Sequence, residues 1–553
     1  MPFGILECDR LEVVPGTAPL RDYVDAPGEL GNAAASQLKH GTGRLSHVVL
    51  IPQPSDSPND PLNWPQWKKD LILLITSMNA GVVGAYGPML GPGFVPIAAE
   101  LDITVEVLSQ ATAWLILTLG LCVFFFNPAA KIWGKRPIYV FCSLVLVIVS
   151  IWGTVADTYS SFLGSRILGA LGMAPYEVLV QATINDLYFV HERATRIAVW
   201  NLFLLCGICG AGFVSGYIIE NLGYEWTFGV CAILFGITGI GVLFLVPETT
   251  FARPSNVYAE TVTQDQKPEA KDKKVGEKGI HIEFHDLPKH INGNGTTGEV
   301  EPEMSYWKSL RVYTGRYSNA QIWKIFTRPL IMFLYPCVFW GFLIYGTTLT
   351  WIVVFTVVNG VLFTEPPYNF TVGQAGLVSL SPFILCIIGE AIAGPLNDWI
   401  CIKLAHRNHG IYEPEFRLVL MVVVATVGTV GFFGFGATVH YQTHWIGPVL
   451  TYGLANMCLA FGSTCVFGYV LDCYPKLAEE AFVAINARNF LTFGLTYFVN
   501  SWLARDGALV VFNVLGACFL GVCSLTIPLW IFGKRIRSWV ARNKFLNDFM
   551  RDV

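Results

Sequence analysis

The chain has 553 residues and a net charge of −4, with 53% hydrophobic residues, only 14% charged residues and a mean hydropathy of +0.50. Soluble proteins carry charges at about a quarter of their positions, so this composition excludes a water-soluble protein of the same length. We therefore predict an all-α membrane protein whose apolar faces meet lipid, and the small net charge gives no reason to expect a nucleic-acid partner.

The first segment, residues 1–68, is polar and rich in proline. It has no apolar core behind a basic start, so it does not resemble a cleaved signal peptide. We expect a largely disordered cytoplasmic tail, followed by a first span that acts as an uncleaved insertion signal. Trp64 and Trp67 beside Lys68 and Lys69 are typical of an anchor at the membrane interface.

Twelve apolar segments of about 20 residues or more follow, six on each side of a polar stretch. This arrangement indicates two repeated six-helix halves, at 69–246 and 329–533. The expected spans are near 70–92, 109–130, 136–156, 161–184, 194–219 and 226–246, and then near 329–358, 371–397, 417–438, 445–471, 480–503 and 507–532.

The polar stretch between the halves, residues 247–328, contains the runs KPEAKDKKVGEKG and NGNGTTGE. Such composition predicts a disordered linker in its middle. Its last part, residues 306–328, combines Trp307, Tyr313, Tyr317 and Trp323 with basic residues. That mixture predicts a helix lying at the cytoplasmic lipid interface.

The distribution of Lys and Arg fixes the expected orientation, because cytoplasmic loops carry most of them. With the amino terminus inside, the six outer loops hold one basic residue, Arg505, out of 36 in the chain. Both termini, including a tail at 534–553, are then cytoplasmic. The same topology places the sequon at Asn369 outside as a candidate glycosylation acceptor, whereas the sequon at Asn294 lies inside.

Two carboxylates lie within predicted spans, Glu177 in span 4 and Glu390 in span 8. An ionised side chain near the bilayer centre costs several kcal/mol, with estimates from about 3 to over 10. One interpretation has both residues facing a central wet cavity, where burial favours protonation and allows proton transfer or cation binding. The alternative is that an arginine or an asparagine of span 11 holds each carboxylate in order to join helices.

Two arginines are the candidate partners. Arg166 lies three turns before Glu177 on the same helix face, and it either couples substrate to protons or pairs helices. Arg488 lies near the inner end of span 11, close to Glu479 and Glu480, so a packing role is favoured.

Aromatic and amide side chains in other spans are candidates for lining the cavity, although each is also a plausible packing residue. They are Asn79, Tyr86, Asn201, Tyr345, Trp351 and Asn456. The fourteen cysteines show no metal-ligand spacing, and there is no phosphate-binding loop, channel filter or nucleophile motif. We expect no cofactor, no metal and no enzymatic activity.

An ordered set of motifs along the chain indicates a family. NPAAKIWGKRP, at 127–137, resembles the loop motif G-x-L-a-D-r-x-G-r-r of the major facilitator superfamily, and GPLND, ending at Asp398, repeats it in the second half. Span 4 carries an R-x-x-x-G-like motif from Arg166, and span 5 an antiporter-like glycine motif from Gly207. With DPLNWP, DLYFVHER, PET and EPEFRL, the set over 60–540 is similar to the fungal twelve-span drug:proton antiporters, near their polyamine and organic-cation permease branch.

The resemblance implies alternating access of the two halves, with the 2–3 and 8–9 loops locking the cytoplasmic side through charges. Asp398 matches the acidic position of the motif, and Lys135 and Arg136 match its basic end. Lys131 stands where an acid is expected, so we predict that the first lock is altered or absent. Neutralising Asp398 should then impair cycling more than neutralising Lys131.

The function predicted from these observations is secondary active transport of small organic molecules, coupled to protons and directed to export. Gly212 stands where the antiporter motif usually has proline, so proton-coupled uptake of polyamines or other organic cations is the alternative. A non-transporting receptor built on a transporter fold is a remote alternative. The expected partners are substrate, protons and the lipid bilayer. The expected state is a monomer in the plasma membrane.

Overall fold

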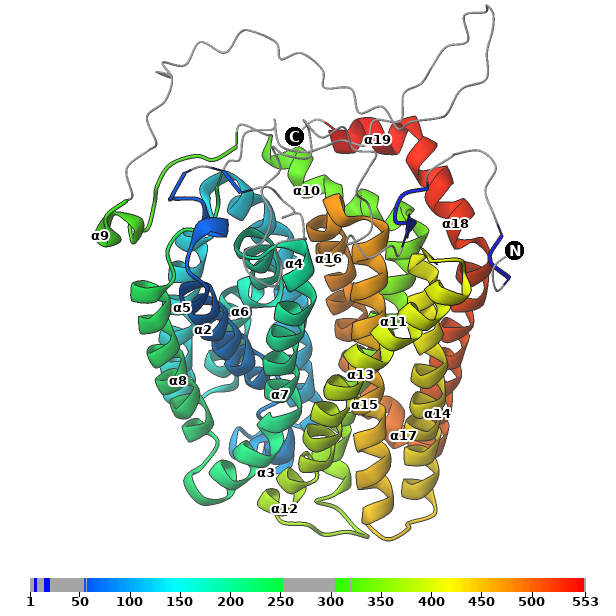
Figure 1. The fold of residues 1–553 in the computed structure, drawn as a ribbon. Helices are drawn as coiled ribbons and strands as arrows, with labels where there is room; N and C mark the ends of the chain where they lie inside the picture. Colours follow the sequence, from blue (N-terminus) through cyan, green and yellow to red (C-terminus); the bar gives the residue numbers. More distant parts are fainter. Residues whose placement is uncertain are drawn as a thin grey trace, which may run out of the picture.

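The computed structural model of the protein describes residues 4–6, 14–19, 54–55, 57–251, 304–318 and 321–551. The expected disorder in the middle of the linker and in most of the amino-terminal tail, and the sequon at Asn294, lie outside these residues. Figure 1 shows the helices as two groups that lie side by side, with the early part of the chain in one group and the late part in the other.

The amino-terminal half begins after the proline-rich turn at Pro61–Asn63. Its helices form over the apolar runs, and the side chains of Thr104 and Thr158 cap two of them by accepting a backbone N–H. The helices are α2 (Gln66–Tyr86), α3 (Phe94–Glu100), α4 (Val105–Trp133), α5 (Arg136–Thr154), α6 (Tyr159–Leu187), α7 (Val190–Leu222) and α8 (Glu225–Leu245), with a 3₁₀ turn η4 at Gly91–Gly93.

The carboxy-terminal half repeats this plan. Thr371 and Gln374 form a capping box at the start of its short outer helix α12. Its elements are α11 (Pro336–Leu362), α12 (Val372–Leu377), α13 (Leu380–Arg407), the 3₁₀ helix η7 (Pro414–Leu420), α14 (Met421–His440), α15 (Ile446–Cys473), α16 (Ala478–Asn486), α17 (Arg488–Ser524), α18 (Thr526–Arg542) and α19 (Lys544–Arg551).

The all-α class is confirmed, and the number of crossings agrees with the sequence. Among the described residues, eleven segments are long and apolar enough to span a bilayer, and the last, Ala478–Arg542, has 65 residues. A straight helix of that length would measure roughly 100 Å, about three times the hydrocarbon core. Gly507, with φ 78° and ψ 164°, breaks it within α17. The segment therefore crosses twice, which gives twelve passages.

The two halves meet along several helix pairs. Helix α4 packs on α17, α7 packs on α12 and α13, and η4 packs on α11. The outward faces carry large apolar side chains, such as Ile148, Ile240 and Val422, each more than 60% exposed. Such faces suit contact with lipid rather than water.

Helices α10, α18 and α19 and the described amino-terminal segment lie at one end of the bundle (Figure 1). We call it the inner end, because the basic residues predict that it faces the cytoplasm. At the opposite, outer end Asn369 is exposed in the loop between α11 and α12. Its glycosylation stays a prediction.

The segment predicted as one interfacial helix is instead two short ones, α9 (Tyr306–Ser309) and α10 (Ile322–Ile331). The described chain between them, up to residue 318, is held on the end of α4 and the start of α5. The backbone N–H of Tyr317 donates to the carbonyl of Ile132 at 2.8 Å, and the Arg136 guanidinium donates to the carbonyl of Leu310 at 2.9 Å. These contacts replace helical hydrogen bonds.

A buried cluster of charges joins the amino-terminal segment to the second half at the inner end. Arg537 pairs with Glu413 at 2.8 Å and with Glu415 at 2.7 Å, and these side chains are at most 1% exposed. Lys534 pairs with Glu413 at 2.7 Å, and the Thr17 hydroxyl donates to Glu413 at 2.7 Å. We call these five residues the inner cluster.

A two-residue sheet lies beside the inner cluster. Strand β1 (Ala18–Pro19) pairs antiparallel with β2 (Ile411–Tyr412). Part of the predicted tail thus packs on the second half, although its sequence adjoins the first.

Candidate functional site

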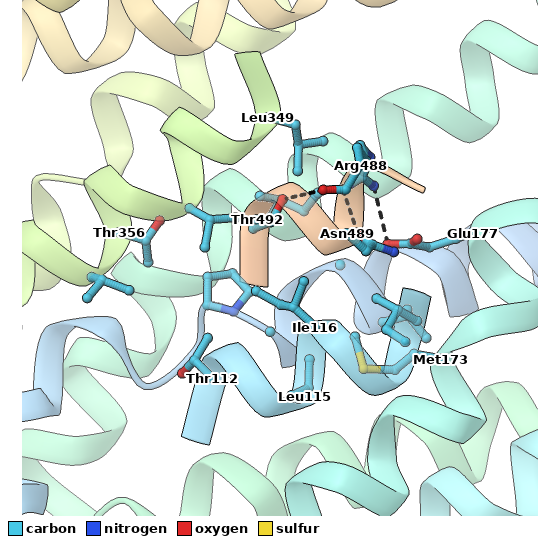
Figure 2. Close-up of a pocket in the computed structure, with 18 of the residues that line it drawn as sticks. Thr112, Leu115, Ile116, Met173, Glu177, Leu349, Thr356, Arg488, Asn489 and Thr492 are labelled. Carbon is cyan, nitrogen blue, oxygen red and sulfur yellow. Dashed lines mark hydrogen bonds and ion pairs between the residues drawn. The ribbon is translucent and has the colours of Figure 1, made fainter. Parts of the chain in front are cut away.

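The candidate site is a cavity of about 80 Å³ between the halves. Its walls are mostly apolar and come from α2, α4, α6, α7, α11 and α17 (Figure 2). A small set of polar side chains projects into it: Thr112, Glu177, Thr356, Arg488, Asn489 and Thr492. An apolar pocket with a few convergent polar groups is the usual form of a small-molecule site.

The central feature of the cavity is an ion pair across the halves. Glu177 on α6 lies 3.6 Å from Arg488 on α17, measured from Oε1 to Nη2, and the two side chains are 10% and 4% exposed. Arg488 also donates to Asn489 Oδ1 at 2.9 Å, and its guanidinium lies 5.1 Å from the ring centre of Tyr345. Figure 2 shows the carboxylate and the guanidinium directed toward each other.

Each member of this pair keeps an unused polar atom. Glu177 Oε2 and Arg488 Nε have no hydrogen-bond partner within the described part of the chain. Both atoms are buried, so a substrate with one donor and one acceptor would reach them only after the cavity opens further. The sequence left two interpretations of Glu177 open, a carboxylate that faces a cavity and a carboxylate held by an arginine. In the structure Glu177 lines the cavity and is also paired with Arg488, for which the sequence favoured a packing role. The sequence signal that could have identified Arg488 as a cavity residue is its charge, because it lies within an apolar span.

Glu390 lies at a different contact between the halves. Asn201 on α7 donates to Glu390 Oε1 at 2.7 Å, and Ser463 on α15 donates to it at 3.4 Å. Among the described residues no cation lies within ion-pair distance of this carboxylate. Glu390 is not among the residues that line the cavity, so the structure separates the two carboxylates that the sequence grouped together.

Arg166 is held by the end of α2. Its guanidinium donates to the carbonyls of Tyr86 at 2.7 Å and Gly87 at 2.8 Å, and the residue is fully buried. A cation at this position satisfies carbonyl groups that a helix leaves without partners at its carboxy terminus. This geometry favours the helix-pairing interpretation of Arg166.

The six predicted lining residues do not line this cavity. Asn201 binds Glu390. Tyr86 lies beside Arg166 and Tyr345 lies beside Arg488, and the other three residues lie within helix contacts. The indole of Trp351 donates to Leu515 O at 3.1 Å, the amide of Asn456 donates to Tyr452 O at 2.9 Å, and Asn79 is fully buried. A role for them in another conformation stays a prediction.

The last turn of α4, which is part of the 2–3 loop motif, makes a charged contact between the halves at the inner end. Lys131 lies 2.6 Å from Glu480 and 3.5 Å from Glu479, both in the first turn of α16. A charged contact between the halves is therefore present here, with its charges reversed relative to the superfamily motif, and its role as an altered lock stays a prediction.

The other basic residues of this loop act inside the first half. Lys135 pairs with Asp186 at 2.6 Å, and Arg136 donates to Leu243 O at 2.7 Å at the end of α8. Glu248 accepts the backbone N–H groups of Lys135 and Arg136 at 3.1 and 3.0 Å, which caps the start of α5.

In the second half, Asp398 is 69% exposed and lies 3.8 Å from Arg417. Arg417 is bound more closely to Asp472, at 2.5 Å. Since Arg417 also lies in the second half, Asp398 makes no charged contact between the halves within the described part of the chain. This geometry favours the opposite order of effects for Lys131 and Asp398 from the one that the motif implies, and that order stays untested.

We therefore expect Lys131→Gln to open the inner end more than Asp398→Asn does. The Lys131 and Glu480 side chains are 25% and 5% exposed, so the pair is intermediate between surface and buried bridges and contributes about 1–2 kcal/mol. Hydrogen exchange read by mass spectrometry in α16 should quicken about 5- to 30-fold in Lys131→Gln and stay nearly unchanged in Asp398→Asn. Equal exchange in both variants would contradict this lock.

Comparisons with known proteins agree on one family. The model of the Major Facilitator Superfamily matches residues 72–497. An uncharacterized MFS-type transporter of Schizosaccharomyces pombe is 29% identical over 530 residues, 90% of each chain. Protein HOL1 of Saccharomyces cerevisiae is 25% identical over 586 residues, 98% of each chain.

A solved structure has the same fold. The proton:xylose symporter XylE of the major facilitator superfamily, bound to 6-bromo-6-deoxy-D-glucose, aligns with a TM-score of 0.56 and 13% identity, covering 84% of this chain and 96% of its own.

Proposed function

The chain belongs to the Major Facilitator Superfamily, whose members are non-enzymatic carriers of small molecules, and we propose that it exports small organic molecules by alternating access driven by protons. The Glu177–Arg488 pair carries the substrate part of this proposal. It offers one negative and one positive group inside an apolar cavity shared by both halves. Amphipathic molecules that combine apolar surface with donors and acceptors fit such a site.

Glu390 supports the proton coupling. An ionised carboxylate accepts strong hydrogen bonds, and here the donor, Asn201, comes from the opposite half. Protonation removes the charge and weakens that bond, so proton binding favours separation of α7 from α13. A proton taken up at Glu390 thereby drives the movement that exposes the cavity to the other side.

A second function, proton-coupled uptake of organic cations, has one observation in its favour. Helix α7 approaches the start of α13 so closely at Gly212 that an added Cβ would collide with the side chain of Ser379. Proline, which the antiporter motif usually has there, would require Ser379 to move, so the chain departs from that motif at a crowded position. We propose export first because the cavity carboxylate Glu177 already has a cationic partner.

The proposal includes the setting of the protein. The described termini both lie at the inner end, and the basic residues gather there. We propose a monomer in the plasma membrane with both termini in the cytoplasm.

The test is flux of labelled organic cations and amphipathic drugs, measured in both directions at external pH 5 and pH 7.5. We expect net efflux that grows as the external solution becomes more acidic, because the inward proton gradient drives exchange. Glu390→Gln should abolish this pH dependence, and Glu365→Gln, in an exposed outer loop, is the matched control. Net uptake would favour the second function, and unchanged pH dependence in Glu390→Gln would remove Glu390 from the coupling.

A further inference from the structure

The described amino-terminal residues lie on the inner end of the second half, beside α18 (Figure 1). We call residues 4–6 and 14–19 the strap. The side chain of Ile5 is fully buried in a small apolar cluster with residues of α13 and η7. The backbone N–H of Leu6 donates to the carbonyl of Ile531 on α18 at 3.0 Å. The strap thus begins with an apolar anchor and a backbone hydrogen bond on the second half.

A tight turn lies in the second part of the strap. The residues V-P-G-T, at 14–17, place proline and glycine at the two central positions, as in a type II turn. The N–H of Thr17 donates to the carbonyl of Val14 at 3.1 Å, and Gly16 has a φ of 86°. A Cβ on Gly16 would lie 2.8 Å from the carbonyl oxygen of Asp472, near the end of α15. Glycine is therefore needed here for the turn and for the close approach to α15.

The turn presents two polar groups to the inner cluster. The Thr17 hydroxyl donates to Glu413 at 2.7 Å, and the carbonyl of Pro15 accepts a hydrogen bond from the Arg537 guanidinium. Glu413 and Arg537 are buried, and a hydrogen bond to a charged group is stronger away from water. Directly after the turn, β1 pairs with β2. The strap is therefore bound through backbone and side chains, as an extended peptide is when it adds to the edge of a sheet.

The strap also holds Tyr412 in place. Ala18 of the strap is the β-sheet partner of Tyr412, and the Tyr412 hydroxyl donates to Asp472 at 2.5 Å. Arg417 donates to the same carboxylate at 2.5 Å. Since Tyr412 follows α13 and Asp472 lies near the end of α15, the strap joins the inner ends of these two helices.

We propose that this face of the second half is a binding site for an extended peptide, that the strap fills it in cis, and that release of the strap slows transport. Helices α13 and α15 pack on each other and on η7, so the bundle stays folded when the strap leaves. The strap is covalently attached to the protein, which gives it a high effective concentration at its site and keeps the site filled.

The effect on transport follows from the helices that the strap joins. Helix α13 carries Glu390 and α15 carries Ser463, which share the contact with Asn201 of the first half. When the strap leaves, the inner ends of α13 and α15 are held less firmly, and this contact between the halves is disturbed. This effect on the rate rests on the proposed function, whereas the docking of the strap does not.

The first test compares the full-length variants Gly16→Ala and Gly4→Ala. Both glycines have a positive φ, but an added Cβ on Gly4 meets nothing within 4 Å. Gly16→Ala should displace the strap, and hydrogen exchange at 411–420, read by mass spectrometry, should quicken about ten-fold or more. Gly4→Ala should change this exchange much less. Thr17→Glu sets a second carboxylate against Glu413, so it should displace the strap in a second way.

The second test asks whether the strap is a separable ligand. A labelled synthetic peptide of residues 1–19 should bind Gly16→Ala and return the exchange at 411–420 to the wild-type rate. The wild-type protein should bind this peptide at least about ten-fold more weakly, because its own strap fills the site. A peptide with Thr17→Val, which lacks the donor to Glu413, should bind Gly16→Ala about ten-fold more weakly than the wild-type peptide does.

The third measurement is flux in proteoliposomes, in whichever direction the protein transports. Flux should fall about five-fold or more in Gly16→Ala and recover when the peptide is present on both sides of the membrane. Unchanged exchange in both Gly16→Ala and Thr17→Glu, or no binding of the peptide to Gly16→Ala, would overturn the peptide site. Normal flux in Gly16→Ala, with quickened exchange, would overturn the effect on transport. Binding and exchange are measured without substrate, so their outcome is independent of the proposed export.

Discussion

Glu177→Gln is expected to lower transport at least ten-fold while the chain still inserts and folds. Glutamine keeps the shape of the side chain but removes the charge that faces Arg488 at 3.6 Å. Arg488 is then a buried cation whose carboxylate partner has become neutral, and a buried charge without its partner is costly. The substrate site changes from neutral overall to positive, so binding of cationic and amphipathic substrates should weaken together.

The measurement is substrate flux and substrate binding in proteoliposomes, with Glu365→Gln as the control for an exposed carboxylate. The double variant Glu177→Gln/Arg488→Gln separates two explanations. If the single variant fails only because Arg488 is left uncompensated, the double variant should recover both folding stability and transport. If the ion pair itself binds substrate, the double variant should recover stability but not transport. Normal flux in Glu177→Gln would remove the ion pair from the mechanism.

Arg537→Leu is expected to cause the largest loss of stability, about 3–5 kcal/mol. Arg537 is fully buried and binds two carboxylates that are also buried. Glu413 keeps Lys534 and Thr17 after the change, but Glu415 has no other ion-pair partner in the described part of the chain. A buried carboxylate without a cation must either be hydrated or be protonated, and both require the packing at the inner end to loosen.

Unfolding in mixed micelles with increasing dodecyl sulfate measures this loss. Arg505→Gln, an exposed arginine at the outer end, should leave the transition unchanged. Arg537→Leu/Glu415→Leu should recover part of the loss, because it removes both buried charges. A single variant as stable as the wild type would show that the inner cluster contributes nothing to stability.

The inner cluster also has an expected pH dependence. Burial raises the pKa of Glu413, but the hydrogen bonds from Lys534 and Thr17 and the charge of Arg537 together lower it by more. The pKa of Glu413 therefore lies below its ordinary value. A carboxylate with a lowered folded pKa stabilises the protein above its unfolded pKa. That contribution is lost as the pH falls through the lowered folded value, and it is fully present at neutral pH.

Much of the fold follows from the sequence, because lipid requires long apolar helices and the apolar runs mark them. The ionisable residues inside those apolar runs can also be read from the sequence, and one of the two interpretations of Glu177 places it in a cavity on that basis. What the sequence cannot supply is the rotation of each helix about its axis. That rotation directs Arg488 into the cavity and Arg166 onto carbonyls of α2, although both are single arginines in apolar spans.

Contacts between segments that are distant in the sequence also could not be predicted from the sequence. Lys131 and Glu480 are 349 residues apart, and only packing shows that they meet. The same holds for the chain from 310 to 318, which is hydrogen-bonded to the end of α4 and the start of α5 and does not form the helix that its composition predicts. Nothing in the sequence around Thr17 indicated that this residue would contact Glu413.

The reversed charges at the inner end limit how this transporter can be recombined with its relatives. A hybrid that takes the loop after α4 from a protein with the usual acidic motif would set that acid against Glu479 and Glu480. Like charges at such short range repel by about 1 kcal/mol or more even near a protein surface. Grafting therefore has to exchange the loop and the first turn of α16 together, and a hybrid that exchanges only one should rest with its inner end open.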